Sequence, residues 1–278
     1  MGRALVARLA ADGHRVTALA RTRAAAGLVE EAGGEPLHGE LADAGPWAAA
    51  AVGAERVFHL AQPRLQPPIR GMQVRGLARA AAEGAAAIRA VVGSRPVVMA
   101  SSALGWGDAA TGRGLALARP ALAAERALAG PELRVVRLPW VYGDGGPIRA
   151  FALALRAGRF RIVGPGDNRW ALVAADDAAR ALLAAADAPA GTYAAAEPHP
   201  PTQLEVVAAL CAGASARRPD HLPPRLADLT FGGPMSRALA ASLAPGPGWR
   251  PVPGWAPRRD WRRDLVSLIL GSPAPGAG

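Results

Sequence analysis

The sequence predicts an α/β protein in which helices cover both faces of a parallel sheet. The first half alternates short apolar runs with longer amphipathic helical patterns, which is typical of parallel strands joined by helices. The apolar runs are almost continuous, as expected for strands that are buried on both faces. After residue 145 the elements become shorter and proline- and glycine-rich loops separate them, which indicates a smaller lobe beside the sheet.

Apolar periodicity and breaker residues place the elements of the first half. The expected strands are 14–20, 35–41, 55–61, 95–102 and 133–139, and the expected helices are 2–11, 22–32, 46–52, 71–92 and 118–130. Helices are also expected in the second half, at about 148–157, 176–187 and 203–213. We therefore expect a sheet domain over residues 1–145, a lobe over 146–270 and a disordered tail over 271–278.

Composition excludes several classes of protein. The chain has 278 residues, of which 51% are hydrophobic, and it contains no apolar run long enough to span a membrane. Arg3, Arg8 and Asp12 interrupt the N-terminal helix with charge, which argues against a signal peptide. A single cysteine, Cys211, excludes a disulfide framework, and the five histidines show no metal-ligand spacing. A cytoplasmic protein without a metal or a membrane partner is the expectation.

The charge is strongly basic, and all 32 basic residues are arginine, giving a net charge of +10. The stretch 248–265, "GWRPVPGWAPRRDWRRDL", interleaves tryptophan with arginine, a pattern that could stack on nucleic-acid bases. The plainer interpretation is that the tryptophans pack on the lobe and the arginines face solvent. We favour the second interpretation and do not expect a nucleic-acid partner.

The beginning of the sequence lacks an element that a dinucleotide-binding sheet normally has. Such a sheet starts with a strand and a glycine-rich turn, and the third glycine opens the first helix. Gly2 stands at that third position, while the strand and the first two glycines are absent. We expect a segment upstream of Met1 to encode a Val/Ile-rich strand and Gly-x-x-Gly. Without that central strand, segments 16–19 and 57–60 should lie about 9–10 Å apart or pair directly.

Six segments in order resemble the extended short-chain dehydrogenase/reductase superfamily, in its NAD(P)-dependent epimerase/dehydratase group. The match covers roughly residues 2–213, and the segments are "HGELAD" (38–43), "VFHLAQ" (57–62), "MASSALGWGD" (99–108), "RLPWVYGDGG" (137–146), "LVAADDAARALLAA" (172–185) and "GTYAAAEPHPPTQLEVVAAL" (191–210). The resemblance implies a Rossmann-like fold whose central first strand is missing from this sequence, with a C-terminal substrate lobe.

The resemblance also implies where a dinucleotide would contact the chain. Gly2 would lie at the pyrophosphate, and Glu40 and Leu41 would lie on the adenine side. The cofactor would pass over Leu60 and Ala61, and its nicotinamide would lie beside Pro139 and Val141. Because only the helix start remains of the glycine turn, we expect the chain as written to bind dinucleotide weakly or not at all.

The end of the second family strand favours NADP over NAD. NAD-selective sites carry a carboxylate there, whereas NADP-selective sites use arginine for the 2′-phosphate. This chain has Arg21 and Arg23 and no carboxylate at that point, and a guanidinium matches phosphate geometry. The alternative is that both arginines are simply solvated in an arginine-rich protein.

The usual catalytic pair of the superfamily is absent. Aligning the family helix on Glu125 places Leu117 at the Tyr position and Ala121 at the Lys position, and the sequence has no lysine. Ser102 aligns with the catalytic serine, although it could equally satisfy local backbone groups. Tyr142 is the only phenol placed near the nicotinamide, but packing beside the cofactor is its more frequent role.

Two further residues of these motifs have structural interpretations. Trp106 takes the usual tyrosine position of its motif and is expected to form a wall of the pocket. Asp177 more often serves as a charge or cap at a helix N-terminus than as a catalyst.

Two functions remain open. The first is an oxidoreductase, epimerase or dehydratase that acts on a small carbonyl or hydroxyl substrate with rearranged acid/base groups. The second is a catalytically inactive sensor or regulator of the NmrA type that binds NADP(H). The expected partner is a small molecule, and the sequence leaves both a monomer and a homodimer open.

Overall fold

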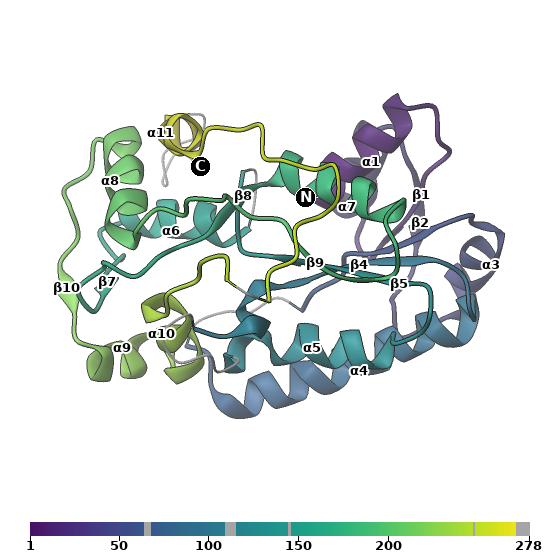
Figure 1. Cartoon of the computed structure of the whole chain (residues 1–278), viewed down its shortest axis with the longest axis horizontal. Coiled ribbons are helices and arrows are strands. Elements are labelled where there is room, and N and C mark those ends of the chain that lie inside the picture. Colours follow the sequence, from purple (N-terminus) through teal and green to yellow (C-terminus); the bar gives the residue numbers. More distant parts are fainter. Residues whose placement is uncertain (64–67, 109–114, 144–145, 247, 271–278) are drawn as a thin grey trace.

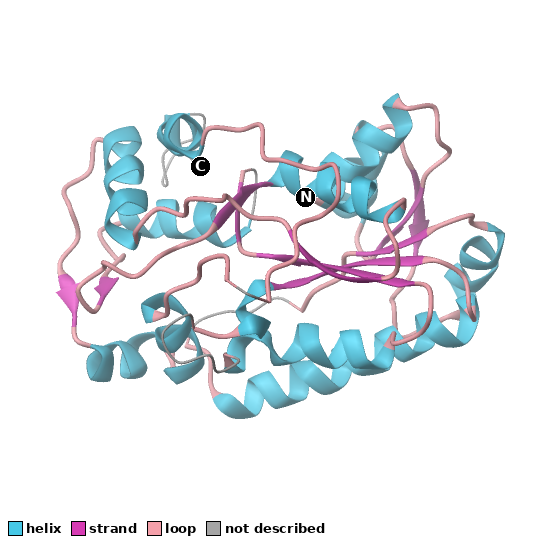
Figure 2. Cartoon of the chain, in the orientation of Figure 1, coloured by secondary structure: helices cyan, strands magenta, loops and turns pink. Residues whose placement is uncertain are grey.

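The computed structural model describes residues 1–63, 68–108, 115–143, 146–246 and 248–270, and Figures 1 and 2 show its elements. The expected tail at 271–278 and the expected domain boundary at residue 145 lie outside the described residues. The strands are β1 (Thr17–Ala20), β2 (Glu35–His38), β3 (Val57–His59), β4 (Val97–Ser102), β5 (Leu133–Leu138), β6 (Trp140–Tyr142), β7 (Ile162–Val163), β8 (Leu172–Ala174), β9 (Gly191–Ala194) and β10 (His221–Leu222). The helices are α1 (Gly2–Ala11), α2 (Arg23–Glu31), α3 (Gly45–Gly53), α4 (Gly71–Val92), α5 (Arg119–Ala127), α6 (Gly146–Arg156), α7 (Ala175–Ala186), α8 (Gln203–Ala214), α9 (Pro224–Phe231), α10 (Gly233–Ala240) and α11 (Trp261–Leu270), with short 3-10 helices η1 (Ala103–Trp106) and η2 (Ala116–Ala118).

The main sheet has four parallel strands in the order β3-β4-β5-β9. Helices α4 and α5 cover one of its faces, and α1 and α7 cover the other (Figure 1). Side chains of β4 are buried on both sides, with Val97 and Met99 at 0% exposure and Val98 at 1%. This is the burial that the continuous apolar run predicts. Strand β9 and helix α7 follow residue 146, so part of the segment expected as a lobe completes this layer.

Strands β1 and β2 form a separate parallel pair. Among the described residues, β1 pairs with no strand other than β2, and β3 pairs with none other than β4. The direct pairing that we considered between segments 16–19 and 57–60 is therefore not formed. No described segment pairs with both strands either, in agreement with a sheet that lacks its central strand.

A second apolar core surrounds the β6-β8 pair and is built mostly by residues of the second half, with Leu104 and Leu117 among its members from the first half. Trp140, Phe151 and Trp170 meet with ring centroids 5.6–5.7 Å apart, in the offset and edge contacts that aromatic rings prefer. Helix α8 starts at a capping box, in which the Thr202 side chain accepts from the Glu205 N–H and Glu205 accepts from the Thr202 N–H. Helices α8 and α11 pack together along this core (Figure 1).

The tryptophans of segment 248–265 pack against the protein. Trp261 is 5% exposed in the core of the second half, whereas Arg262 and Arg263 beside it are exposed. Trp255 instead packs toward α7 and donates a hydrogen bond to the carbonyl of Asp177. The structure thus agrees with the plainer interpretation of this stretch as a packed segment.

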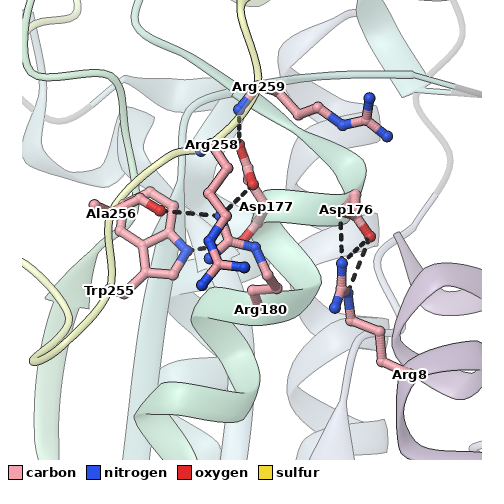
Figure 3. A network of polar contacts seen from close by, with 8 residues as sticks. All are labelled: Arg8, Asp176, Asp177, Arg180, Trp255, Ala256, Arg258 and Arg259. Carbon is pink, nitrogen blue, oxygen red and sulfur yellow. Dashed lines mark hydrogen bonds and ion pairs between the residues drawn. The ribbon is translucent and has the colours of Figure 1, made fainter. Parts of the chain in front are cut away.

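Two adjacent carboxylates in the first turn of α7 hold distant parts of the chain (Figure 3). Asp176 accepts three hydrogen bonds of 2.7–3.0 Å from the guanidinium of Arg8, which ties α1 to α7. Asp177 is 1% exposed, and its Oδ2 accepts from the backbone N–H groups of Arg258 and Arg259 at 2.9 and 3.0 Å. Its Oδ1 accepts from Arg180, whose guanidinium also donates to the Ala256 carbonyl. Asp177 therefore anchors the C-terminal segment 255–259.

Replacing Asp177 with asparagine should loosen segment 255–259, because a neutral amide accepts these hydrogen bonds more weakly than a carboxylate. We expect trypsin to cleave after Arg258 or Arg259 about tenfold faster in Asp177→Asn than in the unsubstituted chain. Asp187→Asn is the control, since its side chain is 75% exposed. Equal cleavage rates in both variants would contradict the anchoring role of Asp177.

Candidate functional site

Parallel strands bring the expected site residues of the main sheet to one edge. Strands β3, β4 and β5 run in the same direction, so their carboxyl ends coincide. Leu60 and Ala61 follow β3, Ser102 ends β4 in register with Leu138, and the buried Pro139 follows β5. Ligands of open α/β sheets bind in this position, outside the carboxyl ends of the strands.

Ser102 lies at the start of η1 and is partly buried. Its side chain makes no capping hydrogen bond to that helix. Four residues later Trp106 stacks on Trp249 with ring centroids 4.8 Å apart and planes 30° apart. Trp106 also makes a cation–π contact, because the guanidinium carbon of Arg137 lies 4.8 Å from the centroid of its ring. Trp106 therefore contacts both the Arg137 guanidinium and a second indole.

A charged network fixes Arg137 from the helix side of the sheet. Its guanidinium donates to both carboxylate oxygens of Glu125, at 3.0 and 2.7 Å, and the Ser101 hydroxyl donates to the same carboxylate. The two charged side chains are only 15% and 13% exposed. The bidentate geometry holds the guanidinium plane in place. Sequence reasoning used Glu125 only to align the helix and missed this pairing, although Arg137 inside an apolar strand was a signal that it needs a carboxylate partner.

The positions aligned with the family Tyr and Lys are apolar and buried. Leu117 in η2 is 8% exposed and packs into the core of the second half. Ala121 in α5 is 4% exposed. Neither side chain can donate or accept a proton, so these two positions supply no acid/base group beside Ser102.

Tyr142 is buried in β6, in register with Ala174 of β8, and is 2% exposed. Its hydroxyl has no hydrogen-bond partner among the described residues. Burial raises the pKa of Tyr142 above its usual value, and the charges of Asp264 and Glu197 raise it further. The phenol therefore stays protonated, and its ring lies in the apolar core around β6 and β8.

The expected adenine-side residues lie around the β1-β2 pair. Arg21 and Arg23 are exposed after β1, on either side of Thr22, whose side chain caps α2 by accepting from the Ala25 N–H at 3.1 Å. Glu40 is exposed after β2, whereas the side chain of Leu41 is partly buried against α4. These strands are parallel, so both arginines and Glu40 lie at the same end of the pair.

The first helix starts at Gly2 without a side-chain cap. A Cβ added to Gly2 would meet no atom within 4 Å, so this glycine is not needed for close packing in the structure. Gly2 itself is exposed at the start of the helix.

Val141, expected beside the nicotinamide, is the partly buried middle residue of β6.

Two titratable groups near the strand ends were not anticipated from the sequence. His59 ends β3 and is 4% exposed, and burial lowers its pKa to about 4. Glu197 lies beyond β9, where its N–H donates to the Leu172 carbonyl, and burial raises its pKa to about 7, with Asp177 and Asp260 adding to the shift. Burial depends on packing between distant segments, so the sequence carried no signal for either.

A separate pocket of about 410 Å³ lies in the second half. Its polar lining consists of Arg169, His199, Glu205 and Arg262, and prolines supply most of the rest. None of the site residues expected from the sequence lines it. Over the part of the chain that is described, no group of three or more histidine, cysteine or acidic side chains could hold a metal ion, and no helix is long and apolar enough to cross a membrane.

Comparison with known proteins identifies the architecture. No protein-family model matches the chain, and no curated protein does. Solved structures do: the human epimerase family protein SDR39U1 with NADPH has a TM-score of 0.74 at 18% identity, covering 98% of this chain and 96% of that one. The chain has the fold of the extended short-chain dehydrogenase/reductases.

Two further structures agree. MoeE5 in complex with UDP-glucose and NAD is 21% identical with a TM-score of 0.70, covering 97% of this chain and 94% of its own. UDP-glucose 4-epimerase of Thermotoga maritima with UDP-glucose is 17% identical, with the same TM-score of 0.70 and coverages of 97% and 94%. The expected Rossmann-like, epimerase/dehydratase type of fold is confirmed.

The buried His59 should make the protein acid-sensitive. The unfolded chain binds a proton on this histidine near pH 6.5, but the native state resists it until about pH 4. Stability should therefore fall as pH decreases through this window, by about 3 kcal/mol in total from this group. His59→Leu should lose that part of the pH dependence when urea unfolding is measured from pH 7 to 4. The exposed His14→Gln is the control, and parallel curves for His59→Leu and the unsubstituted chain would contradict the assignment.

Proposed function

We propose that the chain is an NADP-dependent oxidoreductase of the epimerase/dehydratase type that acts on a small carbonyl or hydroxyl substrate in the cytoplasm. The observation that carries this proposal is the extent of the fold match, since 98% of the chain superimposes on a structure that holds NADPH. The residues at the carboxyl edge support it, because they occupy the position where such sheets bind their ligands.

The residues present fit an NADP molecule at several points. Arg21 and Arg23 are exposed at the end of β1 and could bind a 2′-phosphate. The start of α1 could receive the pyrophosphate, and Leu60 and Pro139 would line the path toward the nicotinamide. The bound nicotinamide would supply the hydride chemistry, while Ser102 would donate a hydrogen bond to the substrate oxygen.

A second function, an NADP(H) sensor without catalysis, is favoured by one specific observation. The two positions that normally hold the acid/base pair are buried and apolar, and the Tyr142 hydroxyl is buried with a raised pKa. A chain with these features can keep the binding surface of the fold while lacking a general acid, which typically contributes about 10²–10⁴-fold to the rate.

Turnover of NADPH separates the two functions. We expect the oxidoreductase to oxidise NADPH, followed by absorbance, with at least one substrate from a panel of ketones, aldehydes and nucleotide sugars. In that case Ser102→Ala or Tyr142→Phe should lower kcat by about a hundredfold or more, the size of a lost general acid. The sensor should bind NADPH without turnover, and Leu117→Tyr combined with Ala121→Lys should add slow carbonyl reduction.

These assays need a form of the chain that binds the cofactor well. They are therefore run both on the chain as written and on a version with a Val-rich strand and a glycine-rich turn added before Met1. Absence of NADPH binding in both forms would overturn both functions. If neither Ser102→Ala nor Tyr142→Phe lowers the turnover rate, the assignment of these two residues to the site is overturned.

Arginines after β1 should decide between the two nicotinamide cofactors. We expect Arg21→Gln combined with Arg23→Gln to weaken NADPH binding by about tenfold or more while leaving NADH binding nearly unchanged, because only NADPH carries the phosphate that they would contact. Fluorescence titration of both cofactors measures the ratio. Arg75→Gln, an exposed arginine of α4, is the control. An equal loss for both cofactors would show that the two arginines do not read the 2′-phosphate.

A further inference from the structure

The pocket of about 410 Å³ in the second half is built by segments that backbone hydrogen bonds hold together. An extended stretch before β8 has loop 198–202 on one side and segment 242–245 on the other. Trp170 donates to the Pro201 carbonyl, and Leu243 donates to the Arg169 carbonyl, both at 2.7 Å. The walls of the pocket are therefore fixed by backbone pairing, and its volume is that of a small-molecule site.

The side chain of Arg169 reaches the pocket because side chains alternate along this extended stretch. Neighbouring side chains of an extended chain point to opposite sides. Trp170 is completely buried in the second apolar core, whereas Arg169 is exposed and lines the pocket. A guanidinium has several N–H donors, and within the described chain Arg169 gives one of them, to the Pro200 carbonyl at 3.1 Å. The others are available to a ligand.

Arg262 brings a second guanidinium to the pocket from the first turn of α11. Its guanidinium carbon lies 4.4 Å from the centroid of the Trp261 ring, and this cation–π contact helps to orient the end of the side chain. Its Nη2 lies 3.4 Å from Oε1 of Glu205. A charged hydrogen bond is normally about 2.7–2.9 Å long, so Arg262 is only weakly paired.

Glu205 is the acidic residue among those that line the pocket, and its carboxylate is already engaged. Its Oε2 accepts from the backbone N–H and the hydroxyl of Thr202, at 2.8 and 3.1 Å. The backbone hydrogen bond from Thr202 lowers the pKa of Glu205, which keeps the carboxylate charged. Two arginines and one carboxylate leave an excess of positive charge in the pocket.

Most of the remaining lining is apolar and rigid. Four of the lining residues are prolines, which have no backbone N–H to offer a ligand: Pro198, Pro200, Pro201 and Pro245. The carbonyls of two of them already accept from Arg169 and Trp170. The pocket thus combines two guanidinium groups with a wall of proline rings.

We propose that this pocket binds a small organic phosphate monoester. Its phosphate would contact the guanidinium groups of Arg169 and Arg262, because guanidinium donors match phosphate oxygens and two cations match a nearly doubly charged group. Its organic part would contact the proline rings. None of the residues proposed to contact the dinucleotide lines this pocket, so the proposal does not depend on the proposed function.

Three probes test the chemistry of the site: phenyl phosphate, inorganic phosphate and benzoate. Each is titrated by calorimetry into the full chain without nucleotide. We expect phenyl phosphate to bind at one site per chain. Inorganic phosphate and benzoate should bind about fivefold more weakly or worse, because the first lacks apolar contacts and the second carries a single charge. Added salt should weaken binding, since the pocket is open to solvent.

Variants of the lining residues should have effects of opposite sign. Arg169→Gln and Arg262→Gln should each weaken phenyl phosphate binding by about tenfold, the size of a lost charged hydrogen bond. Glu205→Gln keeps a residue suited to the capping box but removes a competing negative charge, and it should tighten binding by about threefold. Arg263→Gln is the control, because Arg263 is exposed beside Arg262 but does not line the pocket.

The outcomes decide this proposal separately from the proposed function. Weaker binding in both arginine variants of the pocket, with tighter binding in Glu205→Gln, supports it. It is overturned if phenyl phosphate does not bind at millimolar concentration, or if Arg169→Gln and Arg262→Gln bind it no more weakly than Arg263→Gln. Equal binding of inorganic phosphate or benzoate also overturns it, because the site would then take the free ion or any anion. A chain that binds phenyl phosphate here but no NADPH would overturn the proposed function alone.

Discussion

The fold depends on two neighbouring carboxylates at the start of α7. Asp176 holds the N-terminal helix through Arg8, and the buried Asp177 holds the C-terminal segment through backbone N–H groups (Figure 3). A buried carboxylate must be satisfied by several donors, and here those donors come from segments far apart in the sequence. These contacts are important because no backbone pairing joins the separate sheets of the described chain. Helix packing and the hydrogen bonds of Asp176 and Asp177 connect segments that a continuous sheet would otherwise hold together.

Long amphipathic helices were predictable, and the helix expected at 71–92 is α4 with the same bounds. The parallel strands of the first half were also predictable in place and order, because their apolar runs are bounded by glycine and proline. Strands of two or three residues, such as β7 and β10, were not, since so short a run has no periodicity. The three helices after residue 223 were missed for a different reason: proline and arginine mask an apolar face that forms only against the second core.

For the candidate site, too, one part could be predicted from the sequence and another could not. Its position followed from the sequence, since Ser102 and Pro139 end adjacent strands of a parallel sheet. Its electrostatics did not, because the pairing of Arg137 with Glu125 and the burial of His59 depend on which segments pack together. The structure also gives Tyr142 an apolar environment, in which a phenol without a hydrogen-bond partner among the described residues keeps its proton. The sequence motif alone could not predict this environment, because it depends on which segments pack around β6.

The stack of Trp106 on Trp249 gives the molecule an internal optical reporter. Two indoles held 4.8 Å apart interact electronically, so their circular dichroism in the aromatic region depends on their mutual angle as well as on their surroundings. One ring belongs to the turn that follows Ser102 and the other to the segment leading to α11. A ligand that displaces either ring would thus change the signal of both. The state of the carboxyl edge can be followed by spectroscopy without a label and before any substrate is known.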